Sequence, residues 1–117
     1  MKIFVCDDSK SVHNMLNVYL EDTGFEIMSF YSAIDLILHI ESGNHADQVL
    51  LDWEMPELTG LSALQFIRNS GIGIPIIMLT GKNTESDIRE ALKSGANSYI
   101  LKPFTKDIVL NSLKSTH

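Results

Sequence analysis

The sequence predicts an α/β fold in which a single doubly wound, mainly parallel sheet is covered by helices on both faces. Apolar runs at 3–6, 49–51 and 76–79 are continuous rather than alternating, which is typical of strands buried on both faces. Between these runs lie longer segments with apolar residues at helical spacing. Most of these segments are followed by a glycine, the residue that commonly ends a helix.

Two strand–helix pairs are expected in the first part of the chain. Residues 2–6 are apolar and should form the first strand, and 25–30 alternate as a second strand does. Helices are expected at 9–22 and 32–42. The apolar positions of the first helix are Val12, Met15, Leu16, Tyr19 and Leu20.

Three more strand–helix pairs are expected in the rest of the chain. The strands are predicted at 48–53, 74–80 and 98–101. The helices are predicted at 61–70, 84–95 and 105–114. Doubly wound sheets bind ligands beyond the carboxyl ends of their strands, so the residues at those ends are the candidates for function.

Length and composition fit one soluble domain spanning 1–117. The hydrophobic content is 44% and the charged content 21%, and no apolar stretch is long enough for membrane insertion. The formal net charge of −6 argues against direct binding of nucleic acid, which needs a basic surface. The single cysteine, Cys6, fits a reducing compartment, so a cytoplasmic protein is expected.

Polar residues stand where four of the expected strands end. Two carboxylates follow the first strand and one ends the third, while a hydroxyl ends the fourth and an ammonium group follows the fifth. These residues are Asp7, Asp8, Asp52, Thr80 and Lys102. Because the carboxyl ends of parallel strands lie at one edge of a sheet, we expect these side chains to form one site.

This combination of side chains suits phosphoryl chemistry. Carboxylates in a small pocket raise one another's pKa values unless a cation intervenes, and Mg²⁺ prefers such hard oxygen ligands. Mg²⁺ also neutralises a transferring phosphoryl group, whose other oxygens Thr80 and Lys102 can contact. No histidine or activated serine stands at a strand end. The set therefore favours a phosphorylated aspartate over a hydrolase.

Four segments together resemble the receiver domain of response regulators in two-component signalling. They are VCDDS (5–9), LLDWEMPELTG (50–60), IMLTGK (77–82) and YILKPF (99–104). The resemblance covers essentially the whole chain and is to chemotaxis-type and phosphorelay-type regulators. It implies a flavodoxin-like sheet with strand order 2-1-3-4-5 and five helices.

The resemblance also implies roles for single residues in the acidic pocket. Asp52 resembles the phosphoacceptor. Asp7 and Asp8 match the acidic pair that holds Mg²⁺, one directly and one mainly through water. Asp52 itself and the backbone carbonyl of Glu54 complete the implied set of metal ligands.

Around this pocket the resemblance implies a switch. Thr80 and Lys102 match residues that grip the phosphoryl oxygens, Tyr99 falls at the aromatic switch position, and Lys102–Pro103 matches a peptide bond that is usually cis. On phosphorylation, Thr80 should move toward the phosphoryl group and Tyr99 should turn inward from an exposed rotamer. The surface of the fourth helix, fifth strand and fifth helix should then change as a population shift.

Two further sets of residues are expected near the site. Glu54 and Lys82 lie two residues after Asp52 and Thr80, and we predict that their opposite charges pair across the mouth of the site and lengthen the lifetime of the phosphoryl group. In the family, the face of the first helix beside the site docks the kinase or phosphotransfer partner. The candidate docking residues are Ser11, Val12, Met15 and Pro103, although Met15 could equally belong to the core.

The remaining reactive side chains are interpreted without a catalytic role. The histidines show no metal-ligand spacing and are expected at the surface. They are His13, His39, His45 and His117. Cys6 is expected to be a small core residue, and Trp53 a partly buried neighbour of Asp52.

The leading interpretation is a phosphorylation-controlled switch rather than a conventional enzyme. It would catalyse its own phosphorylation from a phosphohistidine donor and its own slow dephosphorylation. The expected partners are a histidine kinase or histidine phosphotransfer protein, and a downstream protein or attached effector domain. The last helix has few basic residues, which favours a protein-binding output.

Three alternatives stay open. A flavodoxin-like small-molecule module needs a Ser/Thr/Gly-rich phosphate loop after the first strand, where this chain has CDDSKS. A metal-dependent phosphatase with an aspartyl nucleophile would need a cap domain, for which the chain is too short. A pseudo-receiver that is not phosphorylated is disfavoured by the complete polar set at the strand ends.

Overall fold

The computed structural model describes residues 1–116, which form one parallel sheet with the strand order β2-β1-β3-β4-β5. The strands are β1 (Lys2–Cys6), β2 (Glu26–Phe30), β3 (Gln48–Asp52), β4 (Ile76–Thr80) and β5 (Ser98–Leu101). The helices are α1 (Lys10–Tyr19), α2 (Ala33–Glu41), α3 (Gly60–Asn69), α4 (Glu85–Lys93) and α5 (Lys106–Thr116). The predicted fold class, strand order and helices are confirmed.

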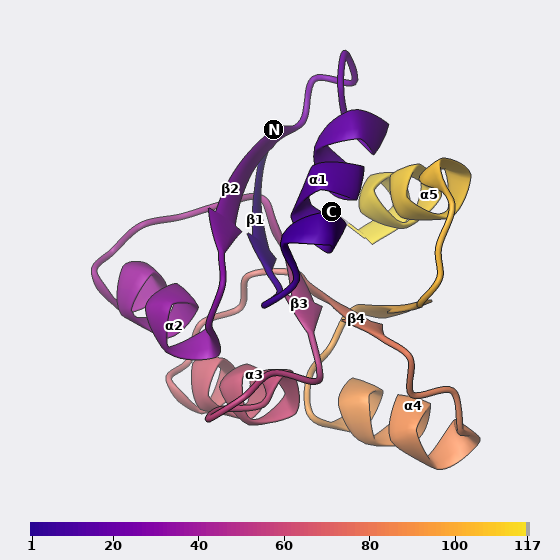
Figure 1. Cartoon of the computed structure of the whole chain (residues 1–117). Helices are drawn as coiled ribbons and strands as arrows, with labels where there is room; N and C mark the ends of the chain where they lie inside the picture. Colours follow the sequence, from indigo (N-terminus) through magenta and orange to yellow (C-terminus); the bar gives the residue numbers. More distant parts are fainter. Residues whose placement is uncertain (117) are drawn as a thin grey trace.

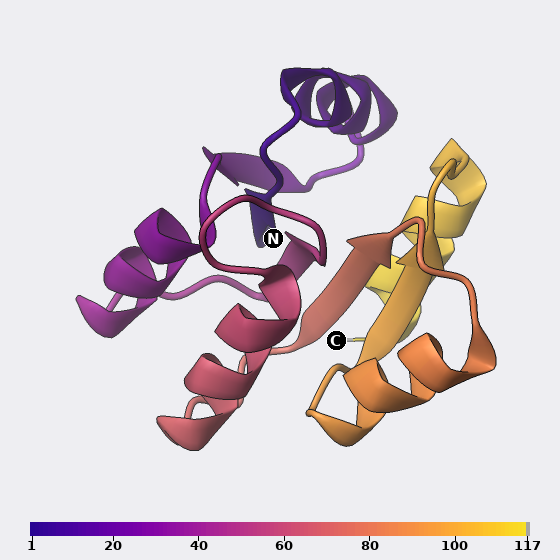
Figure 2. The same cartoon turned by 60° about the horizontal axis from the view of Figure 1, so that its bottom comes forward.

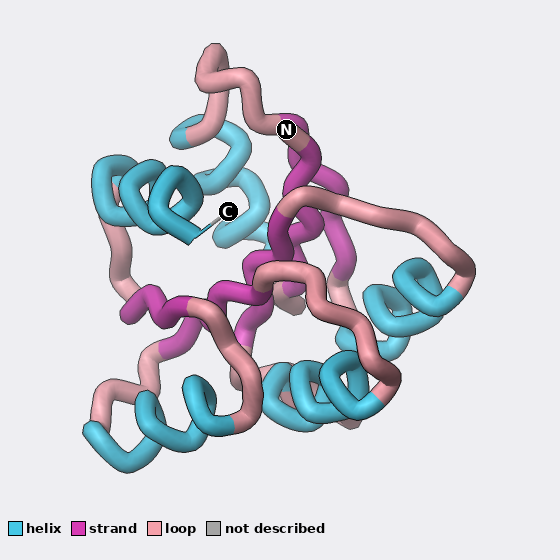
Figure 3. Tube along the Cα trace, turned by 180° about the vertical axis from the view of Figure 1, so that it is seen from behind, coloured by secondary structure: helices cyan, strands magenta, loops and turns pink. Residues whose placement is uncertain are grey.

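Two helical layers cover the sheet. Helices α1 and α5 lie on one face, and α2, α3 and α4 lie on the other (Figure 1, Figure 2). The view from behind shows the strands running between these layers (Figure 3). None of the helices within residues 1–116 is long and apolar enough to cross a membrane.

The central strands contribute side chains to two separate hydrophobic cores. In β1, Ile3 and Val5 join the core under α1 and α5, whereas Phe4 and Cys6 join the core under α2, α3 and α4. Strands β3 and β4 are likewise buried at every position. Successive side chains of a strand point to opposite faces, so a strand between two cores must be apolar throughout its middle.

Side-chain caps set the starts of three helices. Ser32, Thr59 and Thr84 each accept a hydrogen bond from the backbone N–H three residues further on, which begins α2, α3 and α4. The bounds of β1 and β5 are as predicted, and many of the other predicted boundaries are one or two residues too wide. In contrast, α3 begins one residue earlier and α5 ends two residues later than predicted. The largest difference is at α1, which ends at Tyr19 because the chain turns at Asp22, where φ is +61°.

The sheet order brings the ends of β1 and β3 together. Strand β1 pairs with β2 on one side and with β3 on the other, so the winding of the chain reverses at β1. Cys6 is paired with Leu51 in this register. The residues that follow them, Asp7 and Asp52, therefore lie side by side at the point where doubly wound sheets bind ligands.

Candidate functional site

Three carboxylates meet where β1 and β3 end. One carboxylate oxygen from each of Asp7, Asp8 and Asp52 lies within 4.8 Å of the others. Asp7 and Asp52 are buried, whereas Asp8 is exposed at the rim. Two of the three charges are therefore withdrawn from water, and the pocket keeps an opening to solvent on the Asp8 side.

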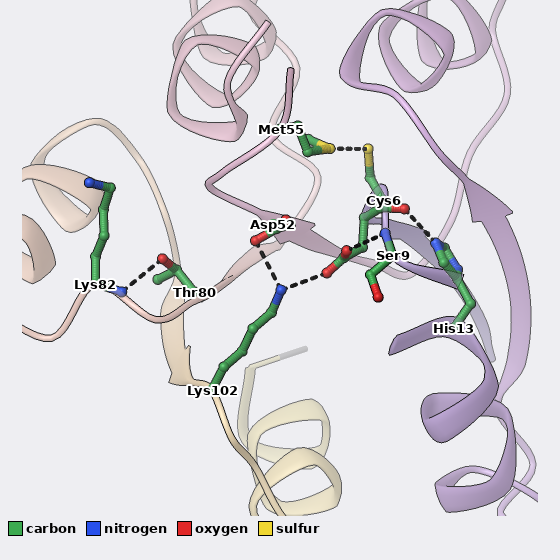
Figure 4. Close-up of polar contacts among 9 residues, drawn as sticks. Cys6, Ser9, His13, Asp52, Met55, Thr80, Lys82 and Lys102 are labelled. Carbon is green, nitrogen blue, oxygen red and sulfur yellow. Dashed lines mark hydrogen bonds and ion pairs between the residues drawn. The ribbon is translucent and has the colours of Figure 1, made fainter. Parts of the chain in front are cut away.

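Lys102 links the two buried carboxylates. Its ammonium nitrogen lies 2.8 Å from Asp7 Oδ2 and 3.1 Å from Asp52 Oδ1 (Figure 4). Its backbone N–H donates to the carbonyl of Thr80 at 2.9 Å, which fixes the point where the side chain leaves β5. The Lys102–Pro103 peptide bond is cis, as the family resemblance implies.

The single ammonium group does not balance the acids around it. Burial and, to a lesser extent, the charge of Asp7 raise the pKa of Asp52 to about 6, against the opposing effects of Lys102 and the Glu54 backbone N–H. Burial alone would lower the pKa of Lys102, but its hydrogen bond to Asp7 and the two carboxylate charges raise that pKa overall. Asp52 therefore remains mostly ionised at neutral pH, as a nucleophile requires.

The donor set fits a divalent cation. The three carboxylates supply hard oxygen ligands within reach of one ion, and a cation there would offset the repulsion between Asp7 and Asp52. The side chain of Glu54 is exposed, and its backbone N–H faces the Asp52 carboxylate. The role of the Glu54 carbonyl as a ligand stays a prediction.

Thr80 ends the strand next to the acceptor. It is fully buried, and its register places it one residue beyond Leu79, the partner of Asp52. Its Oγ1 accepts a hydrogen bond from the backbone N–H of Lys82 at 3.0 Å (Figure 4). The structure therefore brings Thr80 to the same edge as Asp52 and Lys102.

Tyr99 is connected to Thr80 through Lys82. The Tyr99 hydroxyl donates to the Lys82 carbonyl, and its half-buried ring packs against the core under α2, α3 and α4. Burial raises the pKa of Tyr99. The exposed rotamer that we expected before phosphorylation is not the one observed, because the hydroxyl finds a backbone acceptor beside the core.

The expected ion pair between Glu54 and Lys82 is wrong. No ion pair within residues 1–116 contains Glu54, and the Lys82 ammonium nitrogen instead lies 5.4 Å from the ring centroid of Trp53. The negative face of the indole attracts the ammonium group, whereas pairing with an exposed carboxylate gains little in water. Trp53 itself is more buried than expected, with 6% of its surface exposed.

The loop after β3 fixes the backbone of the acceptor. Gly60 donates its N–H to the Trp53 carbonyl at 2.8 Å, and a Cβ at Gly60 would lie 1.8 Å from the Asp52 carbonyl oxygen. Only glycine lets α3 begin this close to β3. Met55 is buried in the loop, with its Sδ 3.8 Å from the Sγ of Cys6. Cys6 is fully buried in the core, which raises the pKa of its thiol, so the prediction of a small core residue is confirmed.

Most of the candidate docking residues are exposed. Ser11 and Pro103 are exposed and Val12 is half-buried. Met15 is 39% exposed, so it is not a core residue. Their role in docking a partner stays a prediction.

The histidines only partly follow the prediction that they lie at the surface. His39 is half-buried, and its ring centroid lies 5.3 Å from that of Phe4 and 5.1 Å from that of Phe30. It completes an aromatic cluster at the edge of the core, because an imidazole ring is flat and largely apolar in its body. His45 is exposed as expected. His117 lies outside the described residues.

His13 is the residue near the site that the sequence analysis missed. It is 1% exposed, with Nε2 2.7 Å from the backbone oxygen of Asp7 and Nδ1 2.9 Å from Ser29 Oγ. The expectation that it lies at the surface is therefore wrong. Its spacing to the buried Leu16 and Leu20 places it on the inner face of α1, a signal that the sequence contained.

The model of the response regulator receiver domain family matches residues 3–114. The chain belongs to this family. Receiver domains are the phosphorylation-activated switches of two-component systems, and they interact with histidine kinases and effector domains. The acidic pocket formed by Asp7, Asp8 and Asp52 therefore belongs to a receiver domain.

Curated relatives of this receiver domain have different architectures. Chemotaxis protein CheY1 of Helicobacter pylori is 31% identical over 117 residues, which cover 97% of this chain and 94% of that protein. The CAI-1 autoinducer sensor kinase/phosphatase CqsS of Vibrio cholerae is 37% identical over 96% of this chain but only 17% of its own length. The transcriptional regulatory protein DltR of Streptococcus agalactiae is 35% identical, and this chain spans 50% of it.

Solved receiver structures agree with the fold. The receiver domain of the Francisella response regulator 1452 has a TM-score of 0.91 and 29% identity, over 97% of this chain and 93% of that one. The chemotaxis protein CheY4 of Vibrio cholerae has a TM-score of 0.90 and 25% identity, over 99% and 98% of the two chains.

Proposed function

We propose that this receiver domain takes a phosphoryl group from a phosphohistidine onto Asp52, with Mg²⁺ held by Asp7, Asp8 and Asp52. One observation carries the proposal: one oxygen from each of three carboxylates lies within 4.8 Å of the others, and the ammonium group of Lys102 contacts only Asp7 and Asp52. Such a pocket repels an anion by itself. It suits the arrival of a phosphoryl group together with a divalent cation.

The transfer needs only groups that stand at the strand ends. A carboxylate oxygen of Asp52 attacks phosphorus, and the new O–P bond forms while the P–N bond to the donor imidazole breaks, leaving its electron pair on nitrogen. Mg²⁺, when bound, neutralises charge on the phosphoryl oxygens. Lys102 already lies against Asp52, so its ammonium group can donate to a phosphoryl oxygen from where it stands. Thr80 is assigned to a second phosphoryl oxygen.

Asp8 and Glu54 complete the proposed metal site from the rim. Asp8 is exposed and can hold the cation directly or through water, since Mg²⁺ keeps several of its waters. The Glu54 carbonyl is assigned as a further oxygen ligand on the family resemblance. Neither side chain has to be desolvated, which favours exchange of the cation with solvent.

The signal is proposed to leave the site through Thr80, Lys82 and Tyr99. Lys82 accepts from Tyr99 at its carbonyl and donates to Thr80 from its N–H. If the Thr80 hydroxyl turns to the phosphoryl group, the Lys82 N–H loses its acceptor. The loop that contains Lys82 can then shift, and with it the carbonyl that accepts from the Tyr99 hydroxyl. Tyr99 belongs to β5, so the surface formed by α4, β5 and α5 would change with it.

The proposed partners follow from this chemistry. A histidine kinase or histidine phosphotransfer protein would supply the phosphoryl group while docked on Ser11, Val12, Met15 and Pro103. A downstream protein or effector domain would bind the α4, β5 and α5 surface, and direct contact with nucleic acid is not proposed because the net charge is −6. The free, buried thiol of Cys6 fits a cytoplasmic location.

The test is the intact mass of the protein after incubation with acetyl phosphate and Mg²⁺. We expect one phosphoryl adduct that disappears with EDTA and in the variant Asp52→Asn. Asp47→Asn is the matched control, because Asp47 is an exposed carboxylate just before β3 and should not be needed. No adduct in the wild type, under conditions where Mg²⁺ demonstrably binds, would instead support the pseudo-receiver.

A further inference from the structure

A hydrogen-bonded chain runs from the half-buried Ser29 of β2 through the buried His13 of α1 to the acidic pocket. Ser29 Oγ lies 2.9 Å from His13 Nδ1. His13 Nε2 lies 2.7 Å from the backbone oxygen of Asp7 (Figure 4). A carbonyl oxygen can only accept, so Nε2 carries the hydrogen, while the Ser29 hydroxyl can donate or accept at Nδ1. The His13 ring also packs against Tyr31 with centroids 4.4 Å apart, which fixes its orientation.

Asp7 is held at each of its polar groups. Its N–H donates to the Phe30 carbonyl at 3.1 Å, and its Oδ1 accepts from the Ser9 N–H at 2.8 Å. Its Oδ2 accepts from Lys102 at 2.8 Å. The remaining polar group is the carbonyl, which accepts from His13.

The carbonyl of Asp7 belongs to the peptide group that leads into Asp8. No side-chain hydrogen bond of Asp8 is found within the described part of the chain, and its carboxylate is exposed. The direction of that carboxylate therefore depends on the backbone before it. His13 is the side chain that sets the plane of this peptide group from the protein interior.

We propose that His13 is a positioning residue for the metal site. By holding the Asp7 carbonyl, it orients the Asp7–Asp8 peptide group and so aims the Asp8 carboxylate at the cation. His13 itself touches neither the cation nor the phosphoryl group. This inference rests on the proposed Mg²⁺ site, whose ligands it supports from behind in the way that outer partners orient metal ligands.

The test measures the Mg²⁺ dissociation constant by calorimetry with no phosphodonor present. His13→Leu should weaken Mg²⁺ binding roughly tenfold, the lower end of the effect of losing an outer partner. His13→Gln keeps a side-chain N–H donor and should restore binding to within about threefold of the wild type. Ser29→Ala leaves the ring but removes its support and should weaken binding about two- to threefold. At saturating Mg²⁺, the phosphorylation rate of His13→Leu should approach that of the wild type.

Gln48→Leu is the matched control. Gln48 is also buried and also donates to a backbone carbonyl at 2.7 Å, that of Leu113, but at the opposite end of the sheet. It should lower the urea midpoint in EDTA, as His13→Leu does, and leave the Mg²⁺ dissociation constant unchanged.

The outcomes separate the proposal from a merely structural role. Wild-type Mg²⁺ affinity in His13→Leu, or failure of His13→Gln to restore it, would overturn the positioning role. If His13→Leu does not fold, unchanged affinity in Ser29→Ala would overturn it. A wild-type protein that binds no Mg²⁺ would contradict the proposed function itself, whatever the variants show.

Discussion

The two ends of the sheet differ in how their polar groups are paired. Where the strands begin, side-chain donors are matched to backbone acceptors: Gln48 Nε2 donates to the Leu113 carbonyl, and the half-buried Arg68 donates to the carbonyls of Gly95 and Ile72 at 3.0 and 2.8 Å. Gln48 Oε1 is buried without a hydrogen-bond partner among the described residues, but it carries no charge. These groups tie the ends of helices to the starts of strands. They stabilise the fold, because each buried donor has an acceptor.

Where the strands end, the charges are not matched. Asp7 and Asp52 are buried and share the one ammonium group of Lys102, and burial raises the pKa of Asp52 to about 6. This end therefore holds repulsion that a cation and a phosphoryl group can relieve. The comparison indicates that unbalanced charge gathers at the carboxyl end of the sheet, where the phosphoryl transfer is proposed.

The largest expected effect tests the close packing of α3 against β3 at the end of the sheet where the strands end. Gly60→Ala should cost about 3 kcal/mol of unfolding free energy and abolish phosphorylation, because its Cβ would lie 1.8 Å from the Asp52 carbonyl oxygen. Gly73 lies in the loop before β4, at the opposite end of the sheet, and a Cβ there would have no atom within 4 Å. Gly73→Ala should therefore change the unfolding free energy by less than about 1 kcal/mol. Urea unfolding measures both, and equal costs would contradict the contrast.

The second effect is a gain in unfolding free energy, expected when the charge of Asp52 is removed. The pKa of Asp52 is raised from 3.8 to about 6, which at about 1.36 kcal/mol per unit costs the folded protein about 3 kcal/mol at pH 7.5. Asp52→Asn removes this cost but must bury an amide, so it should stabilise the metal-free protein by about 2 kcal/mol.

The stabilisation expected from Asp52→Asn should depend on pH in a direction set by the raised pKa of Asp52. Because its pKa is raised, Asp52 binds a proton more tightly in the folded protein than in the unfolded chain. The free-energy cost of keeping Asp52 ionised in the folded protein is therefore absent below pH 3.8, grows between pH 3.8 and about 6, and is complete above that. The advantage of Asp52→Asn, measured by urea unfolding in EDTA, should therefore shrink from pH 7.5 to pH 4.5. An advantage that is constant with pH would contradict the electrostatic explanation.

The third effect should be confined to stability. Arg68→Met removes donors to Gly95, Ile72 and Asn97 while keeping most of the aliphatic stem, and should cost about 1 to 2 kcal/mol. Its phosphorylation rate and Mg²⁺ affinity should equal those of the wild type. Arg89→Met, which breaks only an exposed ion pair, is the control and should have little effect. A loss of Mg²⁺ affinity in Arg68→Met would show that the two ends are coupled.

The smallest effect concerns the mouth of the site. Lys82→Ala removes the ammonium group that lies over Trp53 and should speed dephosphorylation about two- to fivefold, the equivalent of a contact worth 0.5–1 kcal/mol. Glu54→Ala should have a smaller effect, since Glu54 is exposed and does not pair with Lys82. Decay of the phosphoryl adduct by mass spectrometry measures both. Unchanged rates in both variants would contradict the prediction about lifetime.

Much of the fold could be predicted because its signals are local. The runs 3–6, 49–51 and 76–79 are apolar at successive positions, and this pattern has few explanations other than a parallel sheet between two cores. The helix caps at Ser32 and Thr84 are equally local. The convergence of Asp7, Asp8 and Asp52 followed from topology, because strand ends of a parallel sheet share one edge.

The errors concern side chains whose partners are distant in sequence. His13 was expected at the surface because its hydrogen-bond partners, the Asp7 carbonyl and the Ser29 hydroxyl, are invisible to a search for metal-ligand spacing. The Glu54–Lys82 pair was inferred from charge alone, while the Trp53 ring competes for the same ammonium group.

The sequence by itself determined the layered fold, the strand that carries each reactive group and the edge at which those groups gather. Hydrophobic periodicity and the geometry of parallel strands are enough for these conclusions. Only the tertiary structure decided which charges are buried, that Lys102 joins Asp7 to Asp52, and that a histidine supports the acidic pocket from the interior. These features depend on distances of a few ångströms between segments far apart in the chain, which packing fixes and no local pattern encodes.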